Sequence, residues 1–247
     1  MILTIAAKEL RSMFASPLAW VVLAFLQLVL AWIFLARLDY FMNIQAQLSR
    51  LPNPPGLTDI VVAPVFGVAS FVLLMSVPLL TMRLIAEERR NQTMTLLMSA
   101  PLSMTEIVLG KFFATLGFLF LVLLLILAMS LSLLAGGKLD LGMVAANAVG
   151  LLLLSATFAA IGLFVSCLTG HPVVAAVLSL AVFLGLWIIN IAASDPDSPL
   201  HLVSLLRHFE RFTNGTVALT DLIYFALLIA MFLALSIRRL DADRMQA

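Results

Sequence analysis

Long apolar stretches with few or no charged side chains restrict what this chain can fold into. A helix needs roughly 20 mostly apolar residues to cross the hydrocarbon core of a bilayer. Stretches near that length predict spans at about residues 17–36, 60–82, 110–135, 141–169, 172–193 and 217–237. Lipid offers the backbone no hydrogen-bond partners, so each span should be helical, and the alternating pattern of a membrane barrel is absent. The sequence therefore predicts an all-α membrane protein, with residues 1–247 forming a single domain of six transmembrane helices.

The composition supports this class and argues against several others. Only 11% of the residues are charged and 63% are hydrophobic, whereas soluble domains carry about 25% charged residues. The net charge of +1 gives no reason to expect a nucleic acid partner. Cys167 is the only cysteine, which excludes an internal disulfide and a cysteine-cluster metal site. The first residues do not show the sequence of a signal peptide, which has a basic region, a short apolar core and a cleavage site. We therefore expect no removed signal peptide.

The basic residues predict how the spans are oriented, because six spans place both termini on one side. The loops on that side carry more Lys and Arg: Lys8, Arg11, Arg83, Arg89, Arg90, Lys111, Arg238, Arg239 and Arg244. The opposite loops carry Arg37, Arg50, Lys138, Arg207 and Arg211. The positive-inside rule then places both termini, and the short link at residues 169–172, in the cytoplasm.

Residues 1–16 precede the first span and read as an amphipathic helix. Apolar residues such as Ile5 and Leu10 recur at helical spacing, with Lys8 and Arg11 on the other face. Ser16 followed by Pro17 is a typical cap and first turn of a new helix. We expect an elbow helix that lies in the membrane plane and anchors the first span. The alternative is that these residues are only the start of one long first helix.

The segment at residues 87–103, EERRNQTMTLLMSAPLS, interrupts the apolar pattern on the cytoplasmic side. It predicts a helix over residues 87–99 with a charged start and an apolar edge, and Pro101 ends that helix. The charged start is Glu87, Glu88, Arg89 and Arg90, and the apolar edge is Met94, Leu97 and Met98. Ser103 and Glu106 form a capping-box pattern that would begin the third span. The apolar edge could either bind in a groove of a partner protein or lie on the lipid surface.

An external amphipathic, re-entrant element is expected at residues 194–216. Leu202, Leu205, Leu206, Phe209 and Phe212 would share one side of a helix over residues 199–212. His201, His208 and Glu210 lie close enough to suggest a metal or proton site, but their spacing matches no strong ligand pattern. We therefore interpret them as polar residues at the membrane interface and predict no metal site.

Neither an ion-coupled carrier nor an enzyme is favoured by the residues within the spans. Carriers place ionisable side chains in the bundle, yet the clearest span interiors hold none, and Asp59 and Asp221 lie at span edges. Gly110 and Lys111 lack the upstream glycine and the following Ser or Thr of a phosphate-binding loop, and no metalloprotease or hydrolase motif occurs. The chain has no catalytic residue of its own, so energy for uphill transport would come from a separate chain.

The order of these parts resembles that of ABC type-2 exporter permeases. KELRSMFASPLAWVVLAFLQL resembles the start of permeases like the gliding-motility subunit GldF. EERRNQTMTLLMSAPLSMTEIVLGKFFA resembles the cytoplasmic signature of the same group, to which NosY-type copper-site maturation permeases are related. The resemblance extends over the whole chain, but it is specific in these two segments and only hydropathic elsewhere.

The resemblance implies a mechanism for the chain and a set of partner proteins. Residues 87–99 would be a coupling helix seated in a groove of an ATPase subunit, with the charged start at the rim and the apolar edge as anchor. It implies a homodimer or heterodimer of permeases in a bacterial cytoplasmic (inner) membrane, with two ATPase chains that bind ATP and magnesium; this chain would hold no cofactor. The GldF-like group often works beside a companion membrane protein with a large external domain.

The resulting hypothesis is an ATP-driven exporter whose translocation path lies at the permease interface. External access would be gated near Trp187 and Asn190. Two alternatives remain: a complex that transmits force to an external partner without transport, and an ion-coupled carrier that uses Asp59 and Asp221. The cargo stays open among lipid, glycan, peptide and drug.

Overall fold

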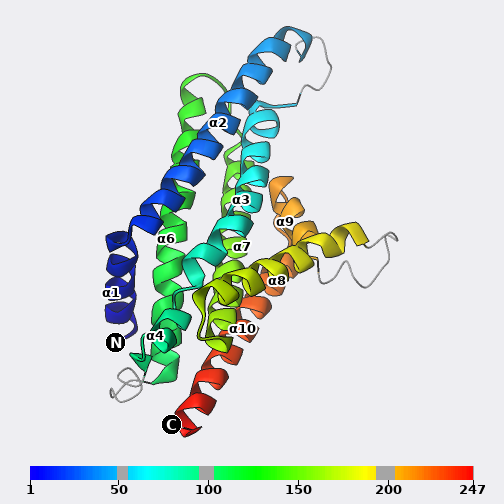
Figure 1. The fold of residues 1–247 in the computed structure, drawn as a ribbon. Coiled ribbons are helices and arrows are strands. Elements are labelled where there is room, and N and C mark those ends of the chain that lie inside the picture. Colours follow the sequence, from blue (N-terminus) through cyan, green and yellow to red (C-terminus); the bar gives the residue numbers. More distant parts are fainter. Residues whose placement is uncertain (49–54, 95–102, 193–203, 247) are drawn as a thin grey trace.

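The structure, a computed structural model, describes residues 1–48, 55–94, 103–192 and 204–246 as a bundle of helices, and no strand occurs in these ranges (Figure 1). The helices are α1 (Ile2–Ala15), α2 (Pro17–Leu48), η1 (Thr58–Val62), α3 (Ala63–Thr81), α4 (Ala86–Arg90), α6 (Met104–Ser132), η2 (Leu133–Ala135), α7 (Leu141–Leu168), α8 (Pro172–Ala192), α9 (Leu205–Thr213) and α10 (Leu219–Gln246). Both chain ends lie at the same end of the bundle (Figure 1).

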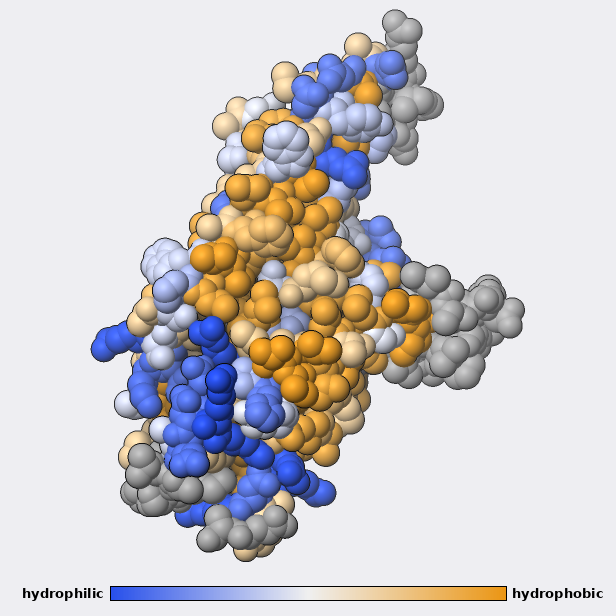
Figure 2. All heavy atoms as spheres, in the orientation of Figure 1, coloured by the Kyte–Doolittle hydropathy of each residue, from blue (hydrophilic) through white to orange (hydrophobic). Residues whose placement is uncertain are grey.

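The prediction of six membrane-spanning helices is confirmed. The helices that are long and apolar enough are Pro17–Gln47, Thr58–Arg90, Met104–Ala135, Leu141–Leu168, Pro172–Ile189 and Leu219–Met245. An apolar band separates hydrophilic side chains at the two ends of the molecule (Figure 2). The surface therefore has the pattern that a multi-pass membrane protein needs.

Helix α7 forms the centre of the bundle. Its most apolar window is 72% buried, against 17% for the corresponding windows of α8 and α10. Small residues let neighbouring helices approach it closely: a Cβ at Gly162 would lie 2.3 Å from Thr81 Oγ1, and one at Gly150 would lie 2.5 Å from Phe212 Cβ. The close contacts of α7 with α3 and α9 therefore depend on glycine.

Helix α1 lies alongside the beginning of α6 (Figure 1). A Cβ at Gly110 would lie 2.6 Å from Ile5 Cγ2, and the rings of Phe14 and Phe118 are 5.5 Å apart. The glycine opens a groove on α6 that accepts the apolar face of α1. The break that the sequence predicts after α1 is present, because Ser16 has an extended backbone with φ −86° and ψ 132°.

Several helix boundaries differ from the predicted spans. Helix α2 continues to Leu48 instead of ending near residue 36, and the residues that prolong it include no Pro or Gly. An Asn43–Asp39 hydrogen bond of 3.1 Å, one turn apart, supports this extension. Helix α6 begins at Met104, because the side chains of Ser103 and Glu106 cap it reciprocally.

Candidate functional site

The predicted coupling segment begins in the structure as a short helix followed by a reversal of the chain. Helix α4 ends at Arg90, and the backbone of Gln92 is left-handed, with φ 58°. Gln92 N–H donates to the Arg89 carbonyl (3.2 Å) and Thr93 N–H to the Glu88 carbonyl (3.0 Å). These two bonds form a Schellman motif that terminates a helix. The expectation of one continuous helix over residues 87–99 was wrong, since its first turn is capped; Leu97 and Met98 lie outside the described residues.

A buried lysine ties this segment to two other helices. Lys111 of α6 is 2% exposed, and its Nζ lies 2.7 Å from Glu88 Oε1 on α4 and 3.2 Å from Glu9 Oε1 on α1. A buried charge needs such partners to offset the loss of hydration. The sequence analysis counted Lys111 among the basic residues of the loops. In the structure its ion pairs connect α6 to α1 and α4.

A second ion pair attaches α4 to the carboxyl-terminal helix. Arg89 contacts Asp243 of α10, and Arg239 lies 3.5 Å from the other oxygen of the same carboxylate. Met94 is 7% exposed and belongs to the hydrophobic core. Glu88, Arg89 and Met94, which the sequence analysis assigned to docking, thus make contacts within the chain.

The backbone of the segment is also held by α7, through a residue whose role the sequence analysis missed. Ser166 Oγ accepts hydrogen bonds from Ile85 N–H (3.1 Å) and Ala86 N–H (3.0 Å) and donates one to the Met82 carbonyl (3.2 Å). These groups lie between α3 and α4, where regular helical bonds are interrupted. No local pattern around Ser166 could reveal this, because its partners lie 80 residues or more earlier in the chain.

Glu87 and Arg90, the other two charged residues of the predicted rim, face a hollow of about 400 Å³. Arg83, Asn91 and Pro172 line the same hollow, so it lies between the segment and the start of α8. Arg83 and Arg90 are exposed. The segment therefore presents a mixed-charge rim that side chains of a partner protein could enter.

On the opposite side of the bundle, the predicted gate residue Trp187 lines a second hollow of about 390 Å³. Asp59, Phe209 and Glu210 also border it, and the ring of Phe71 lies 6.4 Å from that of Trp187. Asn190 lies within α8, but its side chain is not among those described. The gate assignment stays a prediction, now placed beside a defined hollow.

The element that the sequence predicts to be external contains a buried ionic cluster that the sequence analysis did not assemble. Asp221 is fully buried; its Oδ1 lies 2.5 Å from His208 Nδ1 and 3.1 Å from Arg211 Nη1. The Tyr224 ring stacks on His208 with 4.0 Å between centroids. The cluster joins α9 to α10, and no group of three metal-binding side chains occurs among the described residues. His201 lies outside them.

The two acids that a carrier would use are in very different places. Asp59 is exposed, and its Oδ2 accepts a hydrogen bond from Gly56 N–H at 2.9 Å. Asp221 is engaged by a histidine and an arginine of α9. Neither acid lies alone in the bundle interior, as a proton-relay carboxylate would.

Comparison with known proteins gives a family match. A family model described as "ABC-2 family transporter protein" matches residues 36–238, which is more than half of the 247-residue chain. Among curated proteins, none matches the sequence.

Proposed function

The chain belongs to the ABC-2 family of transporter membrane proteins, and from this premise we propose that it is the permease subunit of an ATP-driven exporter whose ATPase is a separate chain. The observation that carries the proposal is the bracing of the cytoplasmic segment around α4. Ser166 holds it to α7, Lys111 joins it to α1 and α6, and Arg89 links it to α10. A force applied at α4 would reach these helices directly.

Arg90 and Asn91 form the proposed contact for the ATPase, because Arg83 and Glu87, which line the same hollow, also border a second one. Mixed charges at a rim favour orientation and specificity of binding. The apolar anchors would be Leu97 and Met98, which follow the rim in the sequence. Met94, in contrast, supports the segment from the core side.

The rest of the assembly follows from the family expectation and forms part of the proposal. Two ATPase chains would bind ATP and magnesium, and two permeases, identical or not, would enclose the path in a bacterial inner membrane. The largely exposed faces of α2, α8 and α10 leave room for lipid and for a second permease. A companion protein with an external domain would complete a GldF-like complex.

The docking proposal is tested by copurification. Arg90→Glu reverses a charge at the rim, and Leu97→Asp with Met98→Asp places charges in the proposed apolar contact. We expect each change to weaken ATPase binding about tenfold or more, the effect of losing an interface hot spot. Arg238→Glu makes the same charge reversal on an exposed residue of α10 and serves as the matched control. Undiminished complex in all variants would remove the docking proposal.

Reconstituted vesicles then separate export from the alternatives. Cargo movement that depends on ATP and on the ATPase chain supports export. ATP turnover without cargo movement would indicate a force-transmitting complex instead. Transport by the purified chain alone under an ion gradient, abolished by Asp59→Asn, or by Asp221→Asn under conditions where α9 keeps its protection from hydrogen exchange, would indicate a carrier.

A further inference from the structure

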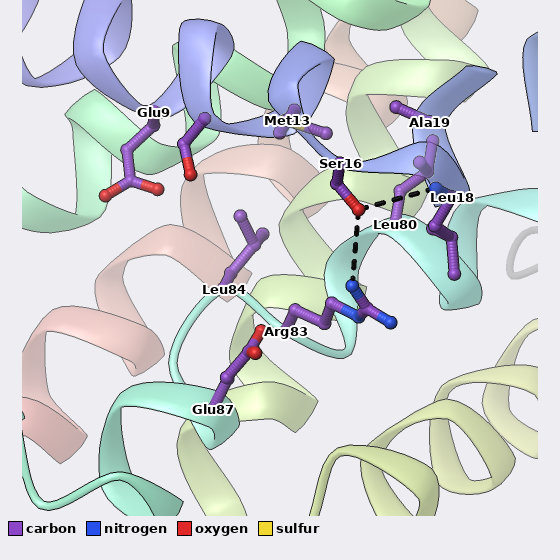
Figure 3. Close-up of a pocket in the computed structure, with 10 residues that line it drawn as sticks. Glu9, Met13, Ser16, Leu18, Ala19, Leu80, Arg83, Leu84 and Glu87 are labelled. Atoms are coloured by element: carbon purple, nitrogen blue, oxygen red, sulfur yellow. Dashed lines mark hydrogen bonds between the residues drawn. The ribbon is translucent and has the colours of Figure 1, made fainter.

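A small hollow of about 210 Å³ lies where α1, α2, the end of α3 and α4 meet (Figure 3). Its wall is half polar and half apolar. The polar residues are Glu9, Ser12, Ser16, Arg83 and Glu87, and the apolar residues are Met13, Leu18, Ala19, Leu80 and Leu84. The lining therefore suits a ligand that has both a polar part and an apolar part.

The charged groups in this hollow do not neutralise one another. Arg83 Nη1 lies 3.4 Å from Ser16 Oγ, and neither Arg83 nor Glu87 forms a salt bridge with any residue that the structure describes. In a continuous helix these two residues would be neighbours one turn apart. The helix is interrupted between them, with Ile85 at φ −123° and ψ −39°. The Arg83 guanidinium and the Glu87 carboxylate therefore both border the hollow without pairing with each other.

Glu9 adds a second carboxylate. One of its oxygens lies 3.2 Å from Lys111 Nζ, and its side chain also borders the hollow. The lining therefore offers one guanidinium, two carboxylates and two serine hydroxyls. A ligand that carries both an anion and a cation complements this set better than a ligand of one sign.

The hollow lies at the level of a membrane surface. The junction of α1 and α2 sits where the hydrophilic end of the molecule meets its apolar band (Figures 1 and 2). Trp20, just after this junction, is 58% exposed and donates from Nε1 to the Phe14 carbonyl at 2.8 Å. Amphipathic tryptophans are enriched at the membrane–water interface. Lys8 and Arg11 of α1 are exposed at the same end.

We propose that this hollow binds the head group of a zwitterionic aminophospholipid, a phosphodiester joined to a primary ammonium. The phosphate would lie on Arg83 with the hydroxyl of Ser16, and the ammonium would donate to Glu87 and Glu9. The glycerol and the first acyl carbons would run along Met13, Leu18 and Leu80. Drug-sized ligands occupy roughly 300–1,000 Å³, so this smaller space suits a head group whose tails stay in the bilayer.

The charge pattern also predicts which lipids bind less well. A choline head group has no N–H to donate to the carboxylates. A glycerol head group leaves the lipid with a net negative charge and offers no cation to Glu87, which forms no salt bridge with the described residues. The site therefore selects a primary ammonium next to a phosphate, and it does so whether or not the chain exports a cargo.

The test measures lipids that remain bound to the intact purified protein. The chain is exchanged into detergent with equal amounts of phosphatidylethanolamine, phosphatidylcholine and phosphatidylglycerol, and bound lipid is counted by native mass spectrometry. We expect phosphatidylethanolamine to be retained about tenfold over the other two, the effect of one charge-assisted hydrogen bond. Equal retention of the three lipids, or preference for phosphatidylglycerol, would overturn the proposal.

Two variants assign the preference to this hollow. Arg83→Gln should reduce retention of phosphatidylethanolamine about tenfold, and Glu87→Gln should remove the preference over phosphatidylglycerol. Both residues lack salt bridges within the described chain, so the protein should still fold, and unfolding of each variant in detergent checks this. Arg238→Gln, on the exposed surface of α10, is the matched control. If Arg83→Gln and Arg238→Gln behave alike, the lipid is not held here.

Discussion

Replacing Lys111 by Met should detach the segment around α4 from α1 and α6. The gross attraction of Nζ to Glu88 at 2.7 Å and to Glu9 at 3.2 Å is about 6 and about 5 kcal/mol at an effective dielectric of about 20. Most of this offsets the dehydration of Lys111, so the pair energies are not a net gain. Removal of the lysine instead leaves two carboxylates facing each other in a largely buried place.

Breaking a buried ion pair on one side costs about 3–5 kcal/mol. The two carboxylates keep 18% and 23% of their side-chain surface exposed, which allows some rehydration and places the expected loss near the lower end, about 3 kcal/mol. The measurement is reversible unfolding in mixed micelles, together with hydrogen exchange of residues 83–94, which should accelerate. Lys138→Met, at an exposed lysine of the opposite end, is the control.

A compensating variant tests the reasoning itself. Glu9→Gln and Glu88→Gln, added to Lys111→Met, remove the repelling charges, and most of the lost stability should return because neutral replacements of buried ion clusters are often tolerated. If the triple variant is as unstable as Lys111→Met, the loss comes from packing and the electrostatic account is wrong. If Lys111→Met alone changes neither measurement, the ion cluster does not brace the segment.

Three further changes should each act through one contact. Gly162→Ala would place a Cβ 2.3 Å from Thr81 Oγ1 and should lower the free energy of unfolding by about 1–3 kcal/mol, whereas Gly185→Ala, with nothing within 4 Å, should raise it by up to about 1 kcal/mol. Ser166→Ala should leave two buried N–H groups at the start of α4 without their acceptor, lowering stability by about 2 kcal/mol and speeding their hydrogen exchange. Asp221→Asn should weaken the attachment of α9 by about 3 kcal/mol, seen as faster hydrogen exchange in α9.

The outcomes that contradict these expectations are equally specific. Equal effects at the two glycines would mean that α3 and α7 are not in close contact. Unchanged exchange at the start of α4 in Ser166→Ala would mean that other groups hold this backbone. Wild-type protection of α9 in Asp221→Asn would mean that apolar contacts alone dock this helix.

The contacts of α4 within the chain change what the segment around it is expected to do under the proposed function. A loop that only binds a partner would leave its charged residues available at the surface. Here Glu88 and Arg89 connect α4 to other helices of the chain, so the segment is suited to transmit displacement as well as to bind. Under the proposed function, Arg90 at the rim remains for the partner.

Features that depend on neighbouring residues could be predicted from the sequence. The six spans follow from hydropathy alone, because the cost of burying polar groups in lipid is large and local. The start of α6 follows from Ser103 and Glu106, whose side chains reach backbone groups only three residues away. The end of α1 at Ser16 is similarly local. In these cases the pattern and the structure agree.

The termination of α4 was harder to predict, although it is also local. Gln92 occupies a left-handed conformation that Gly or Asn usually adopts, so no residue type marked the end of the helix. The apolar periodicity of the following residues favoured one continuous helix over residues 87–99 instead. The structure resolves this conflict in favour of the Schellman motif, and Met94 is directed into the core as a result.

By itself, then, the sequence determined the class of the protein, its spans and the local starts and ends of several helices. Only the tertiary structure decided which charges are shared within the chain: Lys111 with Glu9 across 102 positions, and Arg89 with Asp243 across 154. Hydropathy and capping act over a few residues, whereas an ion pair between helices depends on how the whole bundle packs. The sequence pattern therefore assigned Lys111 to a loop, and only the packing of α1, α4 and α6 shows that it is a buried residue that connects these helices.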